Sequence, residues 1–186
     1  MTLNSDIEKS FIENEIIGLI IPSVKYEEIL IMITDILSKN YDKILYISIN
    51  KPCESLVSGL KKRKIDTDRF HFIDCITRTK KNMLSTENCT YISSPGALYE
   101  IHYAILDVLR KQEIDAALID SPSSLLRYYE HMDVLKFMHL LTTELIVSRC
   151  KGIFPFRKES ARQVRRSIEM FADKVIDIDA GSEFSV

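Results

Sequence analysis

The sequence predicts a three-layer α/β/α fold around a mainly parallel sheet. Short apolar runs that suit buried strands alternate along the chain with longer segments of helical spacing. Most of the predicted strands are apolar at consecutive positions, as expected for strands that helices cover on both faces. No internal repeat, low-complexity tract or linker interrupts the alternation. Repeated strand–helix units of this kind favour parallel strands joined by helical crossovers.

The first third of the chain supplies two predicted strand–helix units. Residues 16–21 (IIGLII) are apolar throughout, and residues 25–38 place apolar side chains at helical spacing among charged ones. Residues 43–48 (KILYIS) are rich in β-forming residues and predict a second buried strand. Pro52 is suited to open the next helix, which ends in the basic run 61–64.

The middle of the chain contains a third strand, a long polar segment and another helix. Residues 70–75 (FHFIDC) predict the strand. Residues 77–90 are polar and lack periodicity, so we expect a surface loop there, followed by a short extended segment at 90–93. Pro95, preceded by a serine, is typical of a helix start and predicts a helix over residues 97–111.

The last third of the chain continues the alternation. Residues 116–120 (AALID) predict a buried strand that ends in a carboxylate, and a loop at 121–124 leads into helical spacing up to about Cys150. Three further elements complete the prediction, namely a strand over 151–156, a helix over 160–172 and an outer strand over 174–179.

The size and charge of the chain limit its organisation and its partners. A chain of 186 residues fits one domain, which we expect to have a core at about 15–179 and a loose tail at 180–186. The net charge of −2 predicts no overall field that attracts nucleic acid or an anionic membrane. The first apolar run is too short to span a bilayer, and the acidic N-terminus is unlike a signal peptide. We therefore expect a cytoplasmic protein without a membrane partner.

No motif predicts a metal site or a side-chain nucleophile. The four cysteines lie far apart without a CxxC pair, so we expect buried free thiols rather than a disulfide or zinc set: Cys53, Cys75, Cys89 and Cys150. The four histidines show no convincing metal-ligand spacing: His71, His102, His131 and His139. Ser121, Ser123 and Ser124 lack a G-x-S-x-G setting, which makes a serine nucleophile unexpected.

Three segments carry a resemblance to a known family. They are residues 43–48 followed by 54–56, residues 93–95 before an amphipathic helix, and residues 117–121 around Asp120. In this order and spacing they resemble the RecA-like ATPase core, most closely single-domain relatives of the circadian clock ATPase KaiC, over nearly the whole chain. The resemblance implies that Asp120 ends the magnesium-holding strand and that another strand lies between this strand and the first one. It also implies self-association into an oligomer.

The chain departs from the family in its phosphate loop. Family members carry several glycines there, and backbone N–H groups of the loop and the following helix N-terminus surround the phosphates. Here the matching stretch is the shorter segment 22–26 (PSVKY). Lys25 corresponds to the family lysine, but Tyr26 stands where a magnesium-binding hydroxyl belongs, and Pro22 has no N–H to donate. The Walker A motif is therefore degenerate.

A second departure concerns water activation. The family carries acidic residues after its second strand, whereas this chain has Asn50 and Lys51, neither of which is a good general base at neutral pH.

Losing three charge-assisted hydrogen bonds from the loop removes about 5–9 kcal/mol, and a micromolar ligand binds with only about 8 kcal/mol. We therefore expect no catalytic residue, no tight ATP binding, no hydrolysis and no cofactor. Residual ATP and magnesium binding is the alternative.

Two sets of residues are candidates for sites. Lys25, Asp120 and Ser121 would form a residual nucleotide or anion site, with an exposed lysine and a polar strand end as the structural alternatives. Arg162, Arg165 and Arg166 would contact an acidic partner or a nucleic-acid phosphate, with a solvated helix face as the alternative. Four large residues after Asp120 are interpreted as core packing or as an exposed interaction surface: Tyr128, Tyr129, Phe137 and Met138.

These observations favour a non-catalytic pseudo-ATPase domain that acts as a regulatory or protein-interaction module. Its partner would be another protein or a second copy of the chain. One alternative is an ATP-binding protein or ATPase with a rearranged phosphate loop. A second alternative is nucleic-acid binding through the basic helix face.

Overall fold

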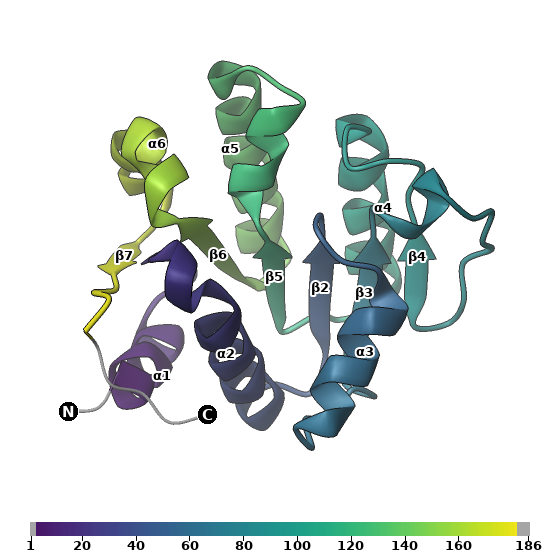
Figure 1. Ribbon diagram of the computed structural model, residues 1–186, viewed down its shortest axis with the longest axis horizontal. Coiled ribbons are helices and arrows are strands. Elements are labelled where there is room, and N and C mark those ends of the chain that lie inside the picture. Colours follow the sequence, from purple (N-terminus) through teal and green to yellow (C-terminus); the bar gives the residue numbers. More distant parts are fainter. Residues whose placement is uncertain (1–2, 182–186) are drawn as a thin grey trace.

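The computed structural model describes residues 3–181, apart from the side chains of residues 161–164 and 166. Within these residues seven strands form one sheet: β1 (Ile16–Ile21), β2 (Ile44–Ser48), β3 (Phe70–Asp74), β4 (Cys89–Tyr91), β5 (Ala116–Asp120), β6 (Lys151–Arg157) and β7 (Lys174–Asp177). All neighbouring strands are parallel, in the order β4-β3-β2-β5-β6-β1-β7 (Figure 1).

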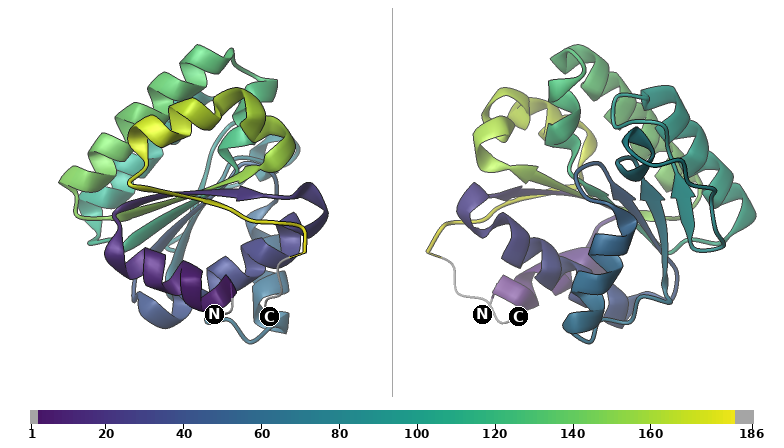
Figure 2. Two further views of the ribbon diagram at one scale, coloured as in Figure 1. Left: turned by 90° about the vertical axis from the view of Figure 1, so that its left-hand side faces the viewer. Right: turned by 45° about the vertical axis from the view of Figure 1, so that its right-hand side comes forward.

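Helices cover both faces of this sheet, which gives three layers. The helices are α1 (Leu3–Glu13), α2 (Tyr26–Asn40), α3 (Cys53–Lys62), α4 (Leu98–Lys111), α5 (His131–Val147) and α6 (Lys158–Phe171). Helices α1, α2 and α3 lie on one face, and α4, α5 and α6 lie on the other (Figure 2). Short 3-10 segments at Ser23–Lys25, Thr77–Thr79 and Pro122–Arg127 connect some of these elements. The three-layer α/β/α prediction is confirmed.

Most strands contribute side chains to both hydrophobic cores, which explains why these strands are apolar at consecutive positions. In β1, Ile17 and Leu19 pack in the core beneath α1, α2 and α3. Ile16 and Ile20 of the same strand pack in the core beneath α4, α5 and α6. The period-2 geometry of a strand therefore gives two buried faces and requires an apolar residue at nearly every position.

The predicted strands and helices are present, and most of their boundaries differ by a few residues. Helix α1 was not predicted, because only Ile7 and Phe11 of its side chains are buried in an otherwise polar segment. Helix α6 begins at Lys158 rather than at residue 160, and β7 ends at Asp177 rather than at residue 179. The segment expected to be a loop over 77–90 contains a 3-10 turn and the first residues of the edge strand β4.

The strand order agrees with the family resemblance, which implies that another strand lies between the first strand and the strand that ends at Asp120. Strand β6 lies between β1 and β5. Residues 182–186 of the expected tail lie outside the described residues. Within residues 3–181, no helix combines the length and apolar character needed to cross a membrane.

Candidate functional site

The candidate site lies beyond the carboxyl ends of β1, β5 and β6, where open parallel sheets usually bind ligands. The connection from β1 to α2 is a single 3-10 turn over Ser23–Lys25. The Lys25 N–H donates to the Pro22 carbonyl oxygen at 3.0 Å, and the Tyr26 N–H donates to the Ser23 carbonyl oxygen. Two amides that a phosphate loop would direct at a ligand are therefore used inside the turn.

Strands β5 and β6 separate at this end of the sheet. Their pairing stops at Leu118 opposite Ile153, although both strands continue. The Lys151 N–H donates to Asp115 and the Gly152 N–H donates to Glu15, so the odd-numbered residues of β6 face β5. Pro155 is on that side and has no N–H, so it cannot extend the ladder.

Tyr26 fills the gap that this separation leaves. Its side chain is fully buried. Its hydroxyl donates to Asp120 Oδ1 at 3.0 Å and lies 3.5 Å from the Pro155 carbonyl oxygen. The first residue of α2 therefore occupies the space between the ends of the two strands.

The Asp120 carboxylate is bound on both of its oxygens. While Tyr26 donates to Oδ1, the Tyr46 hydroxyl of β2 donates to Oδ2 at 3.1 Å. The peptide bond between Asp120 and Ser121 is cis, and the Ser121 side chain is fully buried. The arrangement is a carboxylate held between two phenols rather than one that faces an open cavity.

Burial dominates the protonation behaviour of this cluster. It raises the pKa of Asp120 above its usual value, although the hydrogen bonds from Tyr26 and Tyr46 act in the opposite direction. Burial, followed by the nearby Asp120 charge, also raises the pKa values of Tyr26 and Tyr46 well above the usual range for phenols. Both tyrosines therefore remain protonated donors at neutral pH.

Charged residues close the outer side of the cluster. The Arg157 guanidinium of β6 lies 3.9 Å from the centre of the Tyr26 ring, and its Nη2 lies 3.7 Å from Glu27 Oε1. Glu27 also forms an ion pair with Lys51. Ser23 donates to Glu159 of α6, and this hydrogen bond lowers the pKa of the Glu159 carboxyl. These contacts hold the turn against β6 and α6.

The structure brings together only part of the residual site predicted from sequence. Asp120 and Ser121 are adjacent and buried, and Lys25 lies half-buried in the turn. Asp120 does not cap the turn at Ser121 or Ser123, because its oxygens bind phenols from α2 and β2. Sequence reasoning missed Tyr46 and Arg157, whose contribution depends on strand order and register.

The predicted basic face on α6 is engaged with acidic side chains where it is described. Arg165 Nη1 lies 2.7 Å from Asp177 Oδ2, and Arg165 Nε lies 3.3 Å from Glu169 Oε1. Lys158 Nζ lies 2.7 Å from Asp177 Oδ1. The side chains of Arg162 and Arg166 lie outside the described residues.

A second candidate surface runs along α4 and α5. The hollow between them measures about 380 Å³ and is lined by Leu98, Tyr99, His102, Tyr129, Asp133, Lys136, Phe137 and Leu140. Tyr99 is 93% exposed and Tyr103 is 68% exposed, although both are large aromatic residues. Phe137 and Met138 are buried, in agreement with core packing, whereas Tyr128 is half exposed.

The expectation of free cysteines is confirmed, since all four are buried and unpaired. Among the described residues, no cluster of three or more histidine, cysteine, aspartate or glutamate side chains is placed to hold a metal ion.

Comparisons with known proteins support the fold alone. No family model matches the sequence, and no curated protein matches it. Among solved structures, the chain is similar to an uncharacterised protein from Pyrococcus horikoshii that was crystallised in complex with an unknown peptide. The TM-score is 0.64 at 14% sequence identity, and the match covers 93% of this chain and 82% of that one.

Proposed function

We propose that this chain is a non-catalytic RecA/KaiC-like domain that acts by binding another protein. The observation that carries the proposal is the double occupation of the Asp120 carboxylate by Tyr26 and Tyr46. A magnesium-holding aspartate must offer an oxygen to the metal or its water shell. Here both oxygens accept phenol hydrogen bonds in a buried setting.

The free energy needed to reopen this site argues against nucleotide binding. Moving Tyr26 out loses about 1.5–3 kcal/mol of aromatic burial. It also loses a hydrogen bond to a carboxylate, which is worth about 1.5–3 kcal/mol. Together these amount to about half of the 8 kcal/mol that a micromolar ligand gains on binding. The turn amides would remain unavailable as well.

The surface between α4 and α5 fits a protein segment with apolar anchors. Tyr99 and Tyr103 are exposed on α4, and Leu140 on α5 is 46% exposed at the hollow. Amphipathic peptides commonly bind in grooves between helices through a few apolar side chains. The peptide bound to the Pyrococcus horikoshii protein supports the same class of partner.

Calorimetry with Mg-ATP tests the non-catalytic part of the proposal. We expect calorimetry to show no saturable binding in the micromolar range. We also expect a phosphate-release assay to give no rate above that of buffer alone. Tyr26→Ala, which vacates the space beside Asp120, is the matched variant, and Tyr99→Ala on the far side of the sheet is its control. Micromolar binding by the unaltered chain, with turnover abolished by Asp120→Ala, would contradict the proposal.

A further inference from the structure

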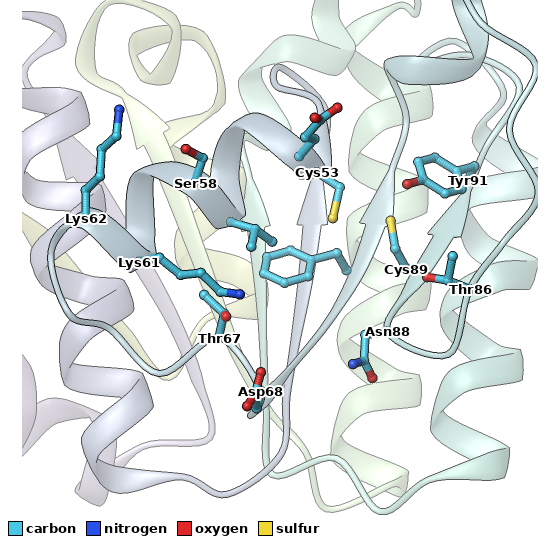
Figure 3. Close-up of a pocket in the computed structure, with 13 residues that line it drawn as sticks. Cys53, Ser58, Lys61, Lys62, Thr67, Asp68, Thr86, Asn88, Cys89 and Tyr91 are labelled. Carbon is cyan, nitrogen blue, oxygen red and sulfur yellow. The ribbon is translucent and has the colours of Figure 1, made fainter.

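A further hollow lies away from the Asp120 cluster. It measures about 770 Å³ and lies between α3 and the β3–β4 edge of the sheet (Figure 3). Two of the four cysteines, Cys53 and Cys89, line it. Neither cysteine takes part in the proposed function.

The fold brings these two thiols together from separate elements. Cys53 is the first residue of α3, and its N–H donates to Asp74 Oδ2 at 2.7 Å, which fixes the helix start against the end of β3. Cys89 is the first residue of β4 and pairs with Phe72 of β3. Figure 3 shows the two side chains pointing toward one another at the hollow, which both of them line.

The two sulfur atoms are not equivalent. A hydrogen bond from the Cys53 thiol lowers the pKa of Cys89, and the Tyr91 hydroxyl, which points toward the Cys89 sulfur, acts in the same direction. The Cys53 pKa is raised by the same hydrogen bond and by burial. Because the Tyr91 hydroxyl is placed to stabilise a thiolate at Cys89, and the thiolate is the reactive form, we assign Cys89 as the attacking thiol.

The other two cysteines lack these features. Burial raises the pKa of Cys150 to about 12 and that of Cys75 well above the usual range. Neither lines the hollow. They provide internal controls in the same molecule.

We propose that Cys53 and Cys89 form a redox-active dithiol site that reacts with a low-molecular-weight disulfide. The Cys89 thiolate attacks one sulfur of that disulfide, forms a mixed disulfide and releases the first thiolate. Cys53 then loses its proton and attacks the Cys89 sulfur, which expels the second thiolate. The protein loses two protons and two electrons, and the small disulfide is reduced to two thiols.

The charges around the hollow indicate a zwitterionic disulfide such as oxidised glutathione. Lys61 extends its amine into the hollow, and Glu54 and Asp68 also line it (Figure 3). Glutathione carries both ammonium and carboxylate groups, so each sign of charge has a partner. The product disulfide would tie the start of α3 to the edge strand β4 across the hollow.

Mass spectrometry of the reduced chain after incubation with oxidised glutathione tests the proposal. Free thiols are alkylated under native conditions before digestion and peptide mapping. We expect a mass loss of two hydrogens and a linked peptide pair that contains Cys53 and Cys89, while Cys75 and Cys150 stay reduced. A linkage that involves Cys75 or Cys150, or no linkage at all, would overturn the proposal.

Single variants test the order of the two attacks. Cys53→Ser should retain glutathione on Cys89, and Cys89→Ser should leave Cys53 unmodified over the same time. Tyr91→Phe should slow the native alkylation of Cys89 by about twofold to tenfold through loss of one hydrogen bond. Equal glutathione loading of the two serine variants would refute the assignment of Cys89 as the attacking thiol.

Discussion

Asp120 is the central residue of the candidate site. It is 2% exposed, and two phenol hydroxyls stabilise its charge in place of water. The sequence predicted that Asp120 would end a buried strand, and the family resemblance implied that Tyr26 stands where a magnesium-binding hydroxyl belongs. The sequence could not predict Tyr46 as a partner, because only the register that sets Tyr46 beside Leu118 brings its hydroxyl near Asp120. The contact of Arg157 with Tyr26 could not be predicted either, because its stacking on Tyr26 requires β6 to lie beside β1.

Removal of one phenol hydroxyl should destabilise the fold. Tyr26→Phe keeps the buried ring and deletes the hydrogen bond to Asp120 Oδ1. We expect the free energy of unfolding to fall by about 1–3 kcal/mol, because a buried carboxylate loses one of its donors. Urea denaturation measures the change. Tyr99→Phe, at a hydroxyl that is fully on the surface, is the control, and an equal loss in both variants would argue against the buried contact.

The raised pKa of Asp120 makes a prediction about pH. Because the folded-state pKa lies above the unfolded value, the folded chain binds more protons in that window, and stability falls as pH rises through it. Asp120→Asn removes this titration. The difference in unfolding free energy between about pH 7 and about pH 4 should therefore become more positive in the variant than in the unaltered chain.

Asp177 supplies a control of opposite sign. Partial burial acts to raise its pKa, but hydrogen bonds from Lys158 and Arg165 lower it overall. Its contribution to stability is present above the unfolded pKa and is lost as pH falls. Asp177→Asn should therefore make the difference in unfolding free energy between about pH 7 and about pH 2.5 more negative. Shifts of the same sign in the two variants would be inconsistent with the opposite environments of these carboxylates.

At the scale of elements, burial explains which predictions succeed. Strands β1, β2 and β5 are buried along their whole length, so their composition alone marks them. Helix α1 and strand β4 bury few residues, and composition does not separate them from polar loops. The first residue of α6, Lys158, forms an ion pair with the last residue of β7, Asp177, and the sequence cannot place these two elements side by side.

Close packing between α5 and β6 can be tested through a glycine. A Cβ on Gly152 would lie 2.9 Å from Ile16 Cδ1 and 3.0 Å from Leu145 Cδ1. Gly152→Ala should therefore destabilise the fold by about 1–3 kcal/mol through overpacking. Gly59 in α3 has no atom near such a Cβ, so Gly59→Ala should stabilise the chain by about 0.5–1 kcal/mol. Thermal or urea unfolding of both variants should give shifts of opposite sign.

At the scale of the whole molecule, strand order determines which residues can form a site. Asp120, Tyr46 and Tyr26 come from three elements that are far apart in sequence, and they meet because β2, β5 and the start of α2 share one end of the sheet. The family resemblance implied that another strand lies between β1 and β5, and the structure shows that this strand is β6. Composition and periodicity could not predict this arrangement, since neither specifies the order of strands in a sheet.

The same topology places the α4–α5 surface on the face of the sheet opposite α2. The role of this surface in peptide binding can therefore be tested separately from the stability of the fold. The double variant Tyr99→Ser, Tyr103→Ser removes two exposed rings and should change the free energy of unfolding by less than about 0.5 kcal/mol per site.

A displayed peptide library selected on the unaltered chain should enrich segments with apolar anchors. Fluorescence anisotropy should show these peptides binding the double variant at least about tenfold more weakly, because exposed aromatic anchors carry much of such binding energy. Val24→Ser, at an apolar side chain that is 86% exposed beside the β1–α2 turn, should leave their affinity unchanged. Peptides that bind all three proteins equally would place the docking surface elsewhere and remove the support that α4 and α5 give to the proposed function.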